Sequence, residues 1–455
     1  QELRTELLRA KNKGKIIVAY IESSALGDEY YLASIADKIV APSGASIGGL
    51  GKMIGTTRIR GLMDKIGIDM QIISKGKYKT TFDSFSKGMT AEQKEMVEGI
   101  IADSYRQMIN DISANRKIGI SKLKEIGDGR ILTASEALKL GLIDEIGYFK
   151  DAAKAGGKLL NVEEEARIVG IEQIEPEEYF IPWTYKIAVI EVDGDIVTGR
   201  SGENIIFGGK STGADTVTDY IKKAYDDMYV RAIVLRVNSP GGSAIASGQI
   251  WGDLKKAKEK GKVVIASMGD VAASGGYFIS VAADKIVANP GTITGSIGVM
   301  GAVRVLAELY NKIGVTVEVV KEGKHADMLS GIRKLTPEER KSLEGLMDET
   351  YHEFIKVVAG GRGISEEAVL SLAEGRVYTG SQAFGVKLVD KLGGFSDAVD
   401  LAKDLVKIPG EPTLIYYREG SPFKGFAMGI SEMLGIKDGL FSKPGSKLSE
   451  YRLSF

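Results

Sequence analysis

One stretch of sequence occurs twice in this chain. Residues 14–51 read GKIIVAYIESSALGDEYYLASIADKIVAPSGASIGGLG, and residues 261–298 read GKVVIASMGDVAASGGYFISVAADKIVANPGTITGSIG. The two stretches align without a gap at an offset of 247 positions (261 − 14). Self-similarity over such a span indicates that one supersecondary unit or domain is present more than once. The fold of the chain is therefore expected to be one domain duplicated.

The match continues beyond these stretches. Residues 65–67 match 312–314 at the same offset, and 129–130 match 375–376 at an offset of 246. We therefore predict two domains, 1–175 and 176–455, with the acidic, proline-containing stretch 163–182 between them.

The second copy carries residues 186–260, for which the first copy has no counterpart. The chain starts at Gln1 inside a helical pattern, so we expect the first copy to be incomplete at its N-terminus.

Both copies alternate short apolar runs with longer helical patterns. The runs are rich in β-branched residues, and they fall at 16–21, 38–42, 70–74, 231–237, 263–268, 285–290 and 317–321. This alternation predicts an α/β fold with largely buried, parallel strands. With 455 residues, 44% of them hydrophobic, the chain is long enough for two full cores.

Composition excludes several kinds of site. The chain has no cysteine and only two histidines, His325 and His352, so no thiolate or histidine-rich metal site is expected. A formal net charge of −1 gives no indication of nucleic-acid binding. No apolar run reaches the length of a transmembrane helix, and any anchor would lie upstream of Gln1. The segment 423–436 has the apolar spacing of a membrane-surface helix, although packing on a protein surface explains it better.

Two glycine-containing loops are candidates for a catalytic site. Ser274 stands at a strand-to-helix turn, where helix N-terminal N–H groups favour negative charge, and Gly275 follows it. The pair Gly241-Gly242 follows another buried strand, so its backbone is open to a second oxyanion contact. Ordinary turns between strands and helices are the alternative explanation for both loops.

The repeat connects Ser274 with a lysine. The first copy has Gly27 at the position of Ser274, and the second copy has Ala326 at the position of Lys79. Each copy thus keeps one half of a Ser–Lys pair, which indicates a shared site at the junction of the two domains. Lysine acts as a base only when burial or a cationic neighbour lowers its pKa. A solvated lysine beside other lysines of the same loop is the alternative.

Four motifs together resemble a known family. GKYKT at 76–80, SPGG at 239–242, AASGGY at 272–277 and TGSIG at 294–298 are similar to motifs of the signal peptide peptidase A family, peptidase family S49. The tandem duplication resembles the long form of these Ser–Lys proteases. The resemblance implies two tandem ClpP/crotonase-like α/β domains and no cofactor or metal.

The same resemblance implies roles for individual residues. Ser274 matches the nucleophile, Lys79 the base, Gly242 and Gly275 the oxyanion hole, and Ser296 a serine that orients the lysine. The pair Thr80-Thr81 departs from the more common Ser-Ala after the lysine.

The resemblance also implies a biological setting. Members of the long form are membrane-anchored homotetramers that face the periplasm or the cell exterior and degrade cleaved signal peptides and similar apolar peptides. Anchor and membrane attachment are thus expectations from the resemblance, as is pairing of Lys79 and Ser274 within one chain. Two alternatives stay open at this point: a crotonase-type acyl-CoA enzyme and a non-catalytic ring scaffold.

Overall fold

The computed structural model describes residues 1–162, 169, 185–203 and 209–417. Apart from Val169, the expected boundary between the copies at 163–182 lies outside the described residues, as does the segment 423–436. Within the described residues, no helix is both long enough and apolar enough to cross a bilayer.

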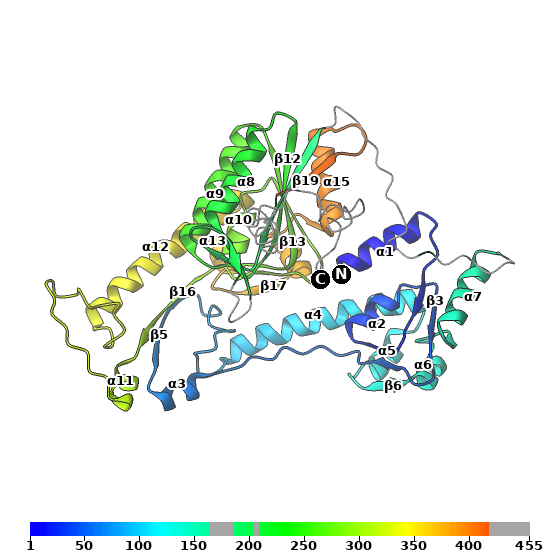
Figure 1. Ribbon diagram of the computed structural model, residues 1–455, viewed down its shortest axis with the longest axis horizontal. Helices are drawn as coiled ribbons and strands as arrows, with labels where there is room; N and C mark the ends of the chain where they lie inside the picture. Colours follow the sequence, from blue (N-terminus) through cyan, green and yellow to red (C-terminus); the bar gives the residue numbers. More distant parts are fainter. Residues whose placement is uncertain (163–168, 170–184, 204–208, 418–455) are drawn as a thin grey trace, which may run out of the picture.

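The second copy is built on one eight-stranded sheet (Figure 1). Six strands run in the order β17-β15-β13-β12-β8-β19. Off this path, β14 pairs with β13, and β18 pairs with β14. Within this sheet, the pair β15–β17 is antiparallel and the other pairs are parallel. A small second sheet has the order β10-β11-β9. The strand bounds are β8 Lys186–Asp193, β9 Asp195–Val197, β10 Gly202–Glu203, β11 Lys210–Gly213, β12 Val230–Ser239, β13 Val263–Ala273, β14 Lys285–Ala288, β15 Ile293–Gly295, β16 Val299–Val305, β17 Val377–Thr379, β18 Lys391–Leu392 and β19 Thr413–Tyr417.

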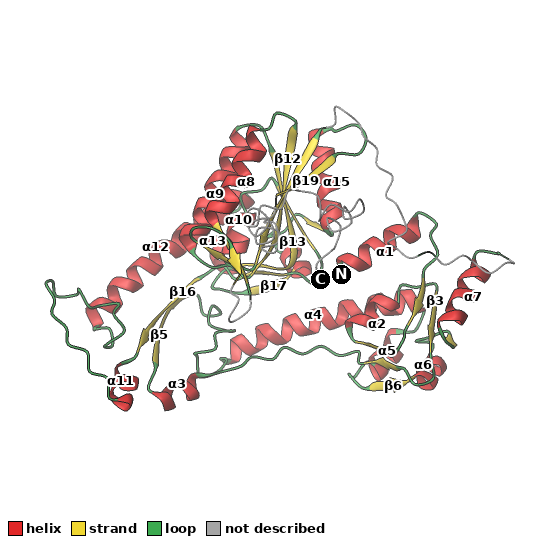
Figure 2. Cartoon of the chain, in the orientation of Figure 1, coloured by secondary structure: helices red, strands yellow, loops and turns green. Residues whose placement is uncertain are grey.

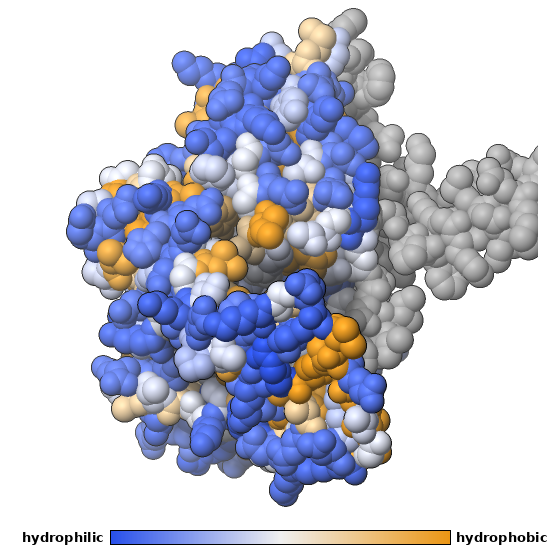
Figure 3. Space-filling view, turned by 90° about the vertical axis from the view of Figure 1, so that its left-hand side faces the viewer, coloured by the Kyte–Doolittle hydropathy of each residue, from blue (hydrophilic) through white to orange (hydrophobic). Residues whose placement is uncertain are grey.

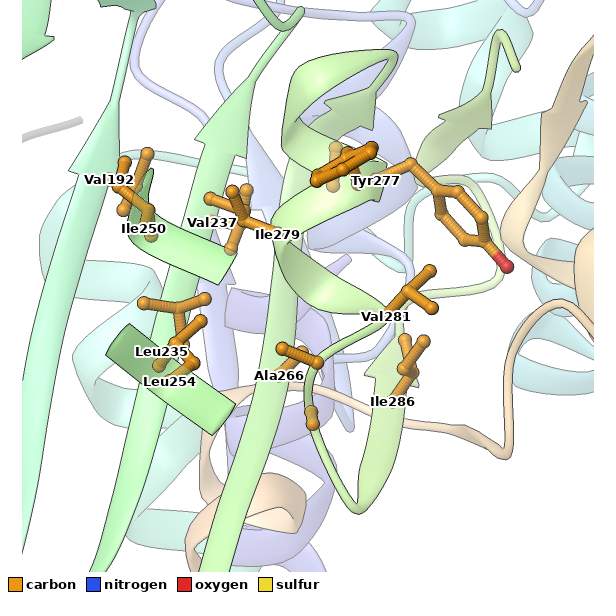
Figure 4. Packing of buried hydrophobic residues seen from close by; sticks show 14 of the residues in the cluster. Val192, Leu235, Val237, Ile250, Leu254, Ala266, Tyr277, Ile279, Val281 and Ile286 are labelled. Atoms are coloured by element: carbon orange, nitrogen blue, oxygen red, sulfur yellow. The ribbon is translucent and has the colours of Figure 1, made fainter. Parts of the chain in front are cut away.

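Helices cover both faces of this sheet. Along β12, Ile233 and Leu235 face the cluster formed with α8, α9 and α10, whereas Ala232 and Val234 face the cluster formed with α15. A strand buried on both faces reads as a continuous apolar run because successive side chains alternate between faces. Figure 4 shows the first of these clusters. The helix bounds are α8 Ala214–Asp226, α9 Ala244–Glu259, α10 Gly275–Ser280, α11 Ala307–Ile313, α12 Pro337–Arg362, α13 Glu366–Leu372, α14 Gly380–Gly385 and α15 Phe395–Val406.

The first copy is smaller and has more helix than sheet (Figure 2). It has two three-stranded sheets, β1-β3-β7 and β2-β4-β6, in which only β4 and β6 pair antiparallel. Its elements are α1 Glu2–Asn12, β1 Val18–Tyr20, β2 Ser24–Leu26, α2 Asp28–Ala33, β3 Lys38–Ala41, β4 Ser46–Gly48, α3 Arg60–Ile66, β5 Asp69–Lys75, α4 Ala91–Arg116, α5 Ile120–Ile126, β6 Ile131–Thr133, α6 Ala134–Leu140, β7 Glu145–Ile146 and α7 Phe149–Leu159. The predicted α/β class with largely parallel strands is confirmed in both copies.

Equivalent residues make equivalent contacts in the two copies. The buried Tyr30 hydroxyl donates to Leu142 O at 2.6 Å, and the buried Tyr277 hydroxyl donates to Leu388 O at 2.9 Å. The long helices α4 and α12 both have 26 residues, and each begins at a threonine whose hydroxyl accepts the N–H of the third helical residue. This capping box fixes the start of a helix from its local sequence. The repeat therefore extends from sequence to hydrogen bonding.

Strand pairing, apolar packing and ion pairs are among the contacts that join the copies. β5 of the first copy pairs antiparallel with β16 of the second. The N-terminal half of α4 packs Met96, Val97 and Ile100 on Val377. On α1, Arg9 binds Asp397 and Asp400 of α15. Figure 1 shows α4 running beneath the large sheet and the β5–β16 pair standing beside it.

One expected strand is wrong. The run 317–321 has the apolar, β-branched composition of a strand, yet it is assigned to no strand. Strand formation needs a partner for the backbone N–H and C=O groups, and no described part of the chain pairs with this run.

Candidate active site

Ser274 lies between β13 and α10 in a constrained backbone conformation. Its φ of 51° and ψ of −118° fall where side chains are disfavoured. Its N–H donates to Gly295 O at 2.9 Å, and its C=O accepts from Phe278 N at 2.8 Å. These two bonds hold the turn, so the Ser274 hydroxyl is presented at the N-terminus of α10.

Lys79 reaches this hydroxyl from the other copy. The loop between β5 and α4 carries it, and Lys79 Nζ lies 2.8 Å from Ser274 Oγ although 195 positions separate the two residues. Nζ also donates to Ser296 Oγ at 3.0 Å and to Ser296 O at 2.9 Å. The predicted meeting of Ser274 and Lys79 at the junction between the copies is therefore found within one chain.

Burial lowers the pKa of Lys79 to about 8. Removing an ammonium group from water disfavours its charged form, and no carboxylate forms an ion pair with Lys79 in the described part of the chain to oppose this. A lysine with this pKa is partly neutral near neutral pH, as a general base must be.

The Lys79 loop is held in place by a loop of the second copy. Tyr78 N donates to Glu374 O at 2.9 Å, and a Cβ on Gly375 would lie 2.6 Å from both Lys79 N and Lys79 Cα. The Arg376 guanidinium stands 5.2 Å from the centre of the Tyr78 ring. The position of Lys79 thus depends on contacts from the copy that carries Ser274.

Ser296 has its own fixed geometry. Its φ is 53°, and its N–H donates to Arg376 O at 2.7 Å. Its counterpart Gly49 has a φ of 60° and donates to Arg130 O at 2.9 Å. The turn is therefore common to both copies, and only the second copy adds the hydroxyl that contacts Lys79.

The backbone N–H groups of Gly242 and Gly275 lie close together beside Ser274. Ile196 N donates to Gly241 O and Ile196 O accepts from Ser243 N, both at 2.8 Å. These two bonds lie on one side of the Gly242 segment, so the N–H of Gly242 points to the side away from Ile196. A Cβ on Gly275 would lie 3.3 Å from Gly242 N. Neither N–H of Gly242 or Gly275 donates to an acceptor among the described residues. The structure therefore brings all five predicted site residues together.

Sequence reasoning missed the residues that hold the lysine loop. The sequence indicates Gly375 and Arg376 only as part of the repeat. It gives no indication of Gln93, whose side chain donates to Lys77 O at 2.7 Å. One usable signal was present: a glycine and an arginine kept together in both copies. Among the described residues, no group of three or more His, Asp or Glu side chains is arranged to hold a metal ion.

Comparison with known proteins identifies the family. The sequence profile of Peptidase family S49 matches residues 9–163 and 256–409, which together make up more than half of the chain. The chain belongs to peptidase family S49. The two matched segments correspond to the two copies of the repeat, so each copy is an S49 unit.

Two relatives are similar over most of this S49 chain. The chloroplastic serine protease SPPA of Arabidopsis thaliana is 33% identical over 90% of this chain and 61% of its own length. Protease 4 of Haemophilus influenzae is 33% identical over 87% of this chain and 66% of its own length. The chain thus spans a little under two thirds of the length of these relatives. Among solved structures, a membrane-bound stomatin-specific protease aligns with 52% of this chain over 99% of its own length, with 16% identity and a TM-score of 0.34.

Proposed function

We propose that this S49 chain is a serine endopeptidase in which Ser274 is the nucleophile and Lys79 the general base. The observation that carries the proposal is the 2.8 Å contact between Lys79 Nζ and Ser274 Oγ, made by a lysine whose pKa burial lowers to about 8. A nucleophile within hydrogen-bond reach of a base, with the base oriented by a third group, is the arrangement that covalent catalysis needs.

In the acylation step, neutral Lys79 removes the Ser274 proton while Oγ attacks the carbonyl carbon of the scissile peptide bond. The resulting ammonium of Lys79 then gives this proton to the leaving amine as the C–N bond breaks. Ser296 holds Nζ through its hydroxyl and its carbonyl oxygen, so the lysine stays oriented in both protonation states.

In the deacylation step, Lys79 accepts a proton from water, and the resulting hydroxide attacks the ester on Ser274. Return of the proton to Ser274 Oγ releases the acid product. In both steps the carbonyl oxygen becomes negatively charged, and the N–H groups of Gly242 and Gly275 are the proposed donors to it. Side chains at these positions would collide, because a Cβ would lie 2.1 Å from Ile196 O at Gly242 and 2.5 Å from Ser247 Oγ at Gly275.

The proposed substrates are cleaved signal peptides and similar apolar peptides bound in an extended form. The segment at Gly242 forms a bridge with Ile196 on one side, and no described strand pairs with its other side. That side offers backbone groups to a substrate strand. A relative described as a putative signal peptide peptidase SppA of Enterococcus faecium is 35% identical over 55% of this chain and 73% of its own length, which supports this substrate class.

The setting is proposed on the family resemblance. It comprises a homotetramer attached to the inner or plasma membrane by an anchor outside this sequence, with the catalytic part facing the periplasm or exterior. The domain limits 1–175 and 176–455 belong to the same proposal, with Lys79 from the first domain and Ser274 from the second.

A peptide-cleavage assay tests the proposed activity. A leucine-rich peptide with a fluorophore and a quencher at its ends is incubated with the wild type, Ser274→Ala and Lys79→Ala. We expect cleavage by the wild type and loss of about 10³-fold or more in each variant. Lys94→Ala, which removes an exposed lysine from α4, is the matched control and should cleave like the wild type.

The outcomes separate the proposal from its alternatives. Undiminished cleavage by Ser274→Ala or Lys79→Ala would contradict the assignment of the pair. A wild type that cleaves no peptide would favour the crotonase-type acyl-CoA enzyme or the non-catalytic scaffold, and turnover of an acyl-CoA would distinguish these two.

A further inference from the structure

One buried amide holds the loop that carries Lys79. Gln93 is the third residue of α4, and it is only 3% exposed. Its Nε2 donates to Lys77 O at 2.7 Å and to Thr80 Oγ1 at 3.2 Å. These two acceptors lie two positions before Lys79 and one position after it, so a single side chain fixes the chain on both sides of the lysine.

The orientation of this amide follows from its partners. Gln93 Oε1 accepts from Thr90 N at 3.1 Å, and Gln93 N donates to Thr90 Oγ1 at 3.2 Å. A backbone N–H bonds only to the oxygen of an amide side chain, so the NH2 group of Gln93 must face the other way, where Lys77 O accepts from it. The capping box at the start of α4 therefore directs this donor at the lysine loop.

The repeat shows what helix capping alone requires at this position. At an offset of 246 (339 − 93), Gln93 corresponds to Glu339 and Thr90 to Thr336. Glu339 Oε2 accepts from Thr336 N at 2.8 Å, and Glu339 N donates to Thr336 Oγ1 at 3.3 Å. A glutamate thus forms the same capping box as a glutamine, because the box uses only a side-chain oxygen.

The two copies differ in what the rest of this side chain contacts. Glu339 Oε1 accepts from Arg333 Nη2 at 2.7 Å and lies 2.9 Å from His325 Nδ1. Figure 3 views the molecule from the end that carries α12 and β16, and hydrophilic side chains cover most of that surface. The copy that has Ala326 in place of Lys79 therefore has a carboxylate here, and the copy that has Lys79 has a neutral donor.

A negative charge at position 93 would oppose the action of the base. A carboxylate close to a buried lysine favours the ammonium form and raises the lysine pKa. Burial instead lowers the pKa of Lys79 to about 8, and its polar contacts are with the uncharged Ser274 and Ser296. The amide of Gln93 holds the loop without changing this balance.

The ionised groups around the loop are bound to partners other than Lys79. They are Glu374 and Asp348, paired with lysines at 3.1 and 2.7 Å, Asp83, bound to a backbone N–H at 3.2 Å, Arg58, bound to a carbonyl oxygen at 2.6 Å, and Arg376, stacked on a tyrosine ring. The charge of the side chain at position 93 is thus a feature that one substitution changes by itself.

We propose that Gln93 is a positioning residue for the general base: its neutral amide holds the chain on both sides of Lys79 by donated hydrogen bonds and places no negative charge beside the lysine. The proposal rests on the proposed function, because it takes Lys79 as the base. It accounts for a glutamine at a position where a glutamate caps the helix equally well.

Gln93→Glu separates the two roles of this side chain. The variant keeps the capping oxygen, as Glu339 does in the second copy, but it loses both donated bonds and adds a charge. We expect kcat/KM for a leucine-rich peptide to fall at least about 10-fold, mainly through kcat, because the lysine loop is displaced. The rising limb of the pH profile should move about 1 unit to higher pH. A wild-type kcat/KM with an unmoved limb would overturn the proposal.

Thr90→Ala is the matched control. It removes the hydroxyl that caps α4 but keeps both bonds that Gln93 donates to the lysine loop. We expect a lower melting temperature with the rising limb still near pH 8. A limb that moves equally in Thr90→Ala and Gln93→Glu would reduce the role of Gln93 to helix capping. If Gln93→Glu does not fold, Gln93→Met removes the donors without adding a charge, and an unchanged plateau of kcat/KM in that variant would equally overturn the proposal.

A titration of Lys79 without substrate separates this proposal from the proposed function. The protein is labelled with lysine carrying carbon-13 at Cε, and the NMR signal of Lys79 is the one absent from Lys79→Ala. Its midpoint should lie near pH 8 in the wild type and about 1 unit higher in Gln93→Glu. A midpoint that moves in a protein whose wild type cleaves no peptide would contradict the proposed function alone. A midpoint that stays in place, with peptide cleavage by the wild type, would contradict the role of Gln93 alone.

Discussion

Ser274 and Gly27 adopt the same backbone conformation, with φ and ψ of 51° and −118° in one and 55° and −111° in the other. Both donate their N–H to a glycine of the strand paired with their own, Gly295 of β15 at 2.9 Å and Gly48 of β4 at 2.8 Å. A glycine takes this conformation without cost, whereas a serine there costs on the order of 1–3 kcal/mol. Gly27 of the first copy shows that a glycine fits this turn, yet the second copy keeps a strained serine there. Such a serine is expected if its hydroxyl is needed for the reaction.

The rate should rise with pH. Lys79 must be neutral to act as base, and its neutral form dominates above its pKa of about 8. We therefore expect kcat/KM for peptide cleavage to increase through a single ionisation near pH 8 and then to level off. A profile that is flat between pH 6 and 10, or one that falls with pH across this range, would contradict the assignment of the base.

Ser296 is expected to act as a positioning residue. Ser296→Gly removes the hydroxyl that contacts Lys79 Nζ at 3.0 Å and suits the φ of 53°. Loss of one hydrogen bond of about 1–1.5 kcal/mol predicts a kcat about 10-fold lower with KM unchanged. The hydroxyl accepts from the ammonium form, so its loss should also shift the rising limb of the pH profile to lower pH. An unshifted profile with an unchanged kcat would show that the contact has no part in the reaction.

Gly375 should control the position of Lys79. Gly375→Ala brings a Cβ within 2.6 Å of Lys79 N and Lys79 Cα, so the lysine loop must move. A displacement of about 1 Å at a reacting group predicts a loss of roughly 10²-fold in kcat/KM.

The matched control for Gly375→Ala is Gly363→Ala at the end of α12. It has a similar positive φ of 64° and nothing within 4 Å, so it should lose stability but keep its activity. Equal activity of the two variants, measured on folded protein, would exclude this role for Gly375.

The pair should be intramolecular. Because Lys79 and Ser274 meet within one chain, a mixture of Ser274→Ala and Lys79→Ala chains should cleave no more peptide than either variant alone. The mixture is measured after joint refolding, so that chains exchange freely. Recovery of a substantial part of the wild-type rate would mean that the site forms between chains.

The sequence was sufficient to predict that Lys79 and Ser274 meet, because the evidence for this lay in the repeat. Gly27 opposite Ser274 and Ala326 opposite Lys79 indicated a divided site, and each predicted residue lies at the junction. The alternation of apolar runs with helical patterns likewise predicted the parallel sheets.

The pairing of β5 with β16 could not be predicted. The run 70–74 reads as a strand, but composition does not tell whether its partner belongs to the same copy or is antiparallel. The equivalent run 317–321 reads the same way and has no partner in the described chain. Strand composition shows that a segment is able to pair, whereas the partner is decided by tertiary contacts such as Gly67 against Leu309.

The most direct test of the Ser274–Lys79 pair is labelling with a fluorophosphonate, followed by peptide mapping by mass spectrometry. The reagent reacts with a serine that an adjacent base has activated, and it requires no knowledge of the substrate. We predict modification of Ser274 alone, at a rate that rises through pH 8 and falls at least about 100-fold in Lys79→Ala. Modification of another serine, or a Ser274 rate that is the same with and without Lys79, would contradict the account.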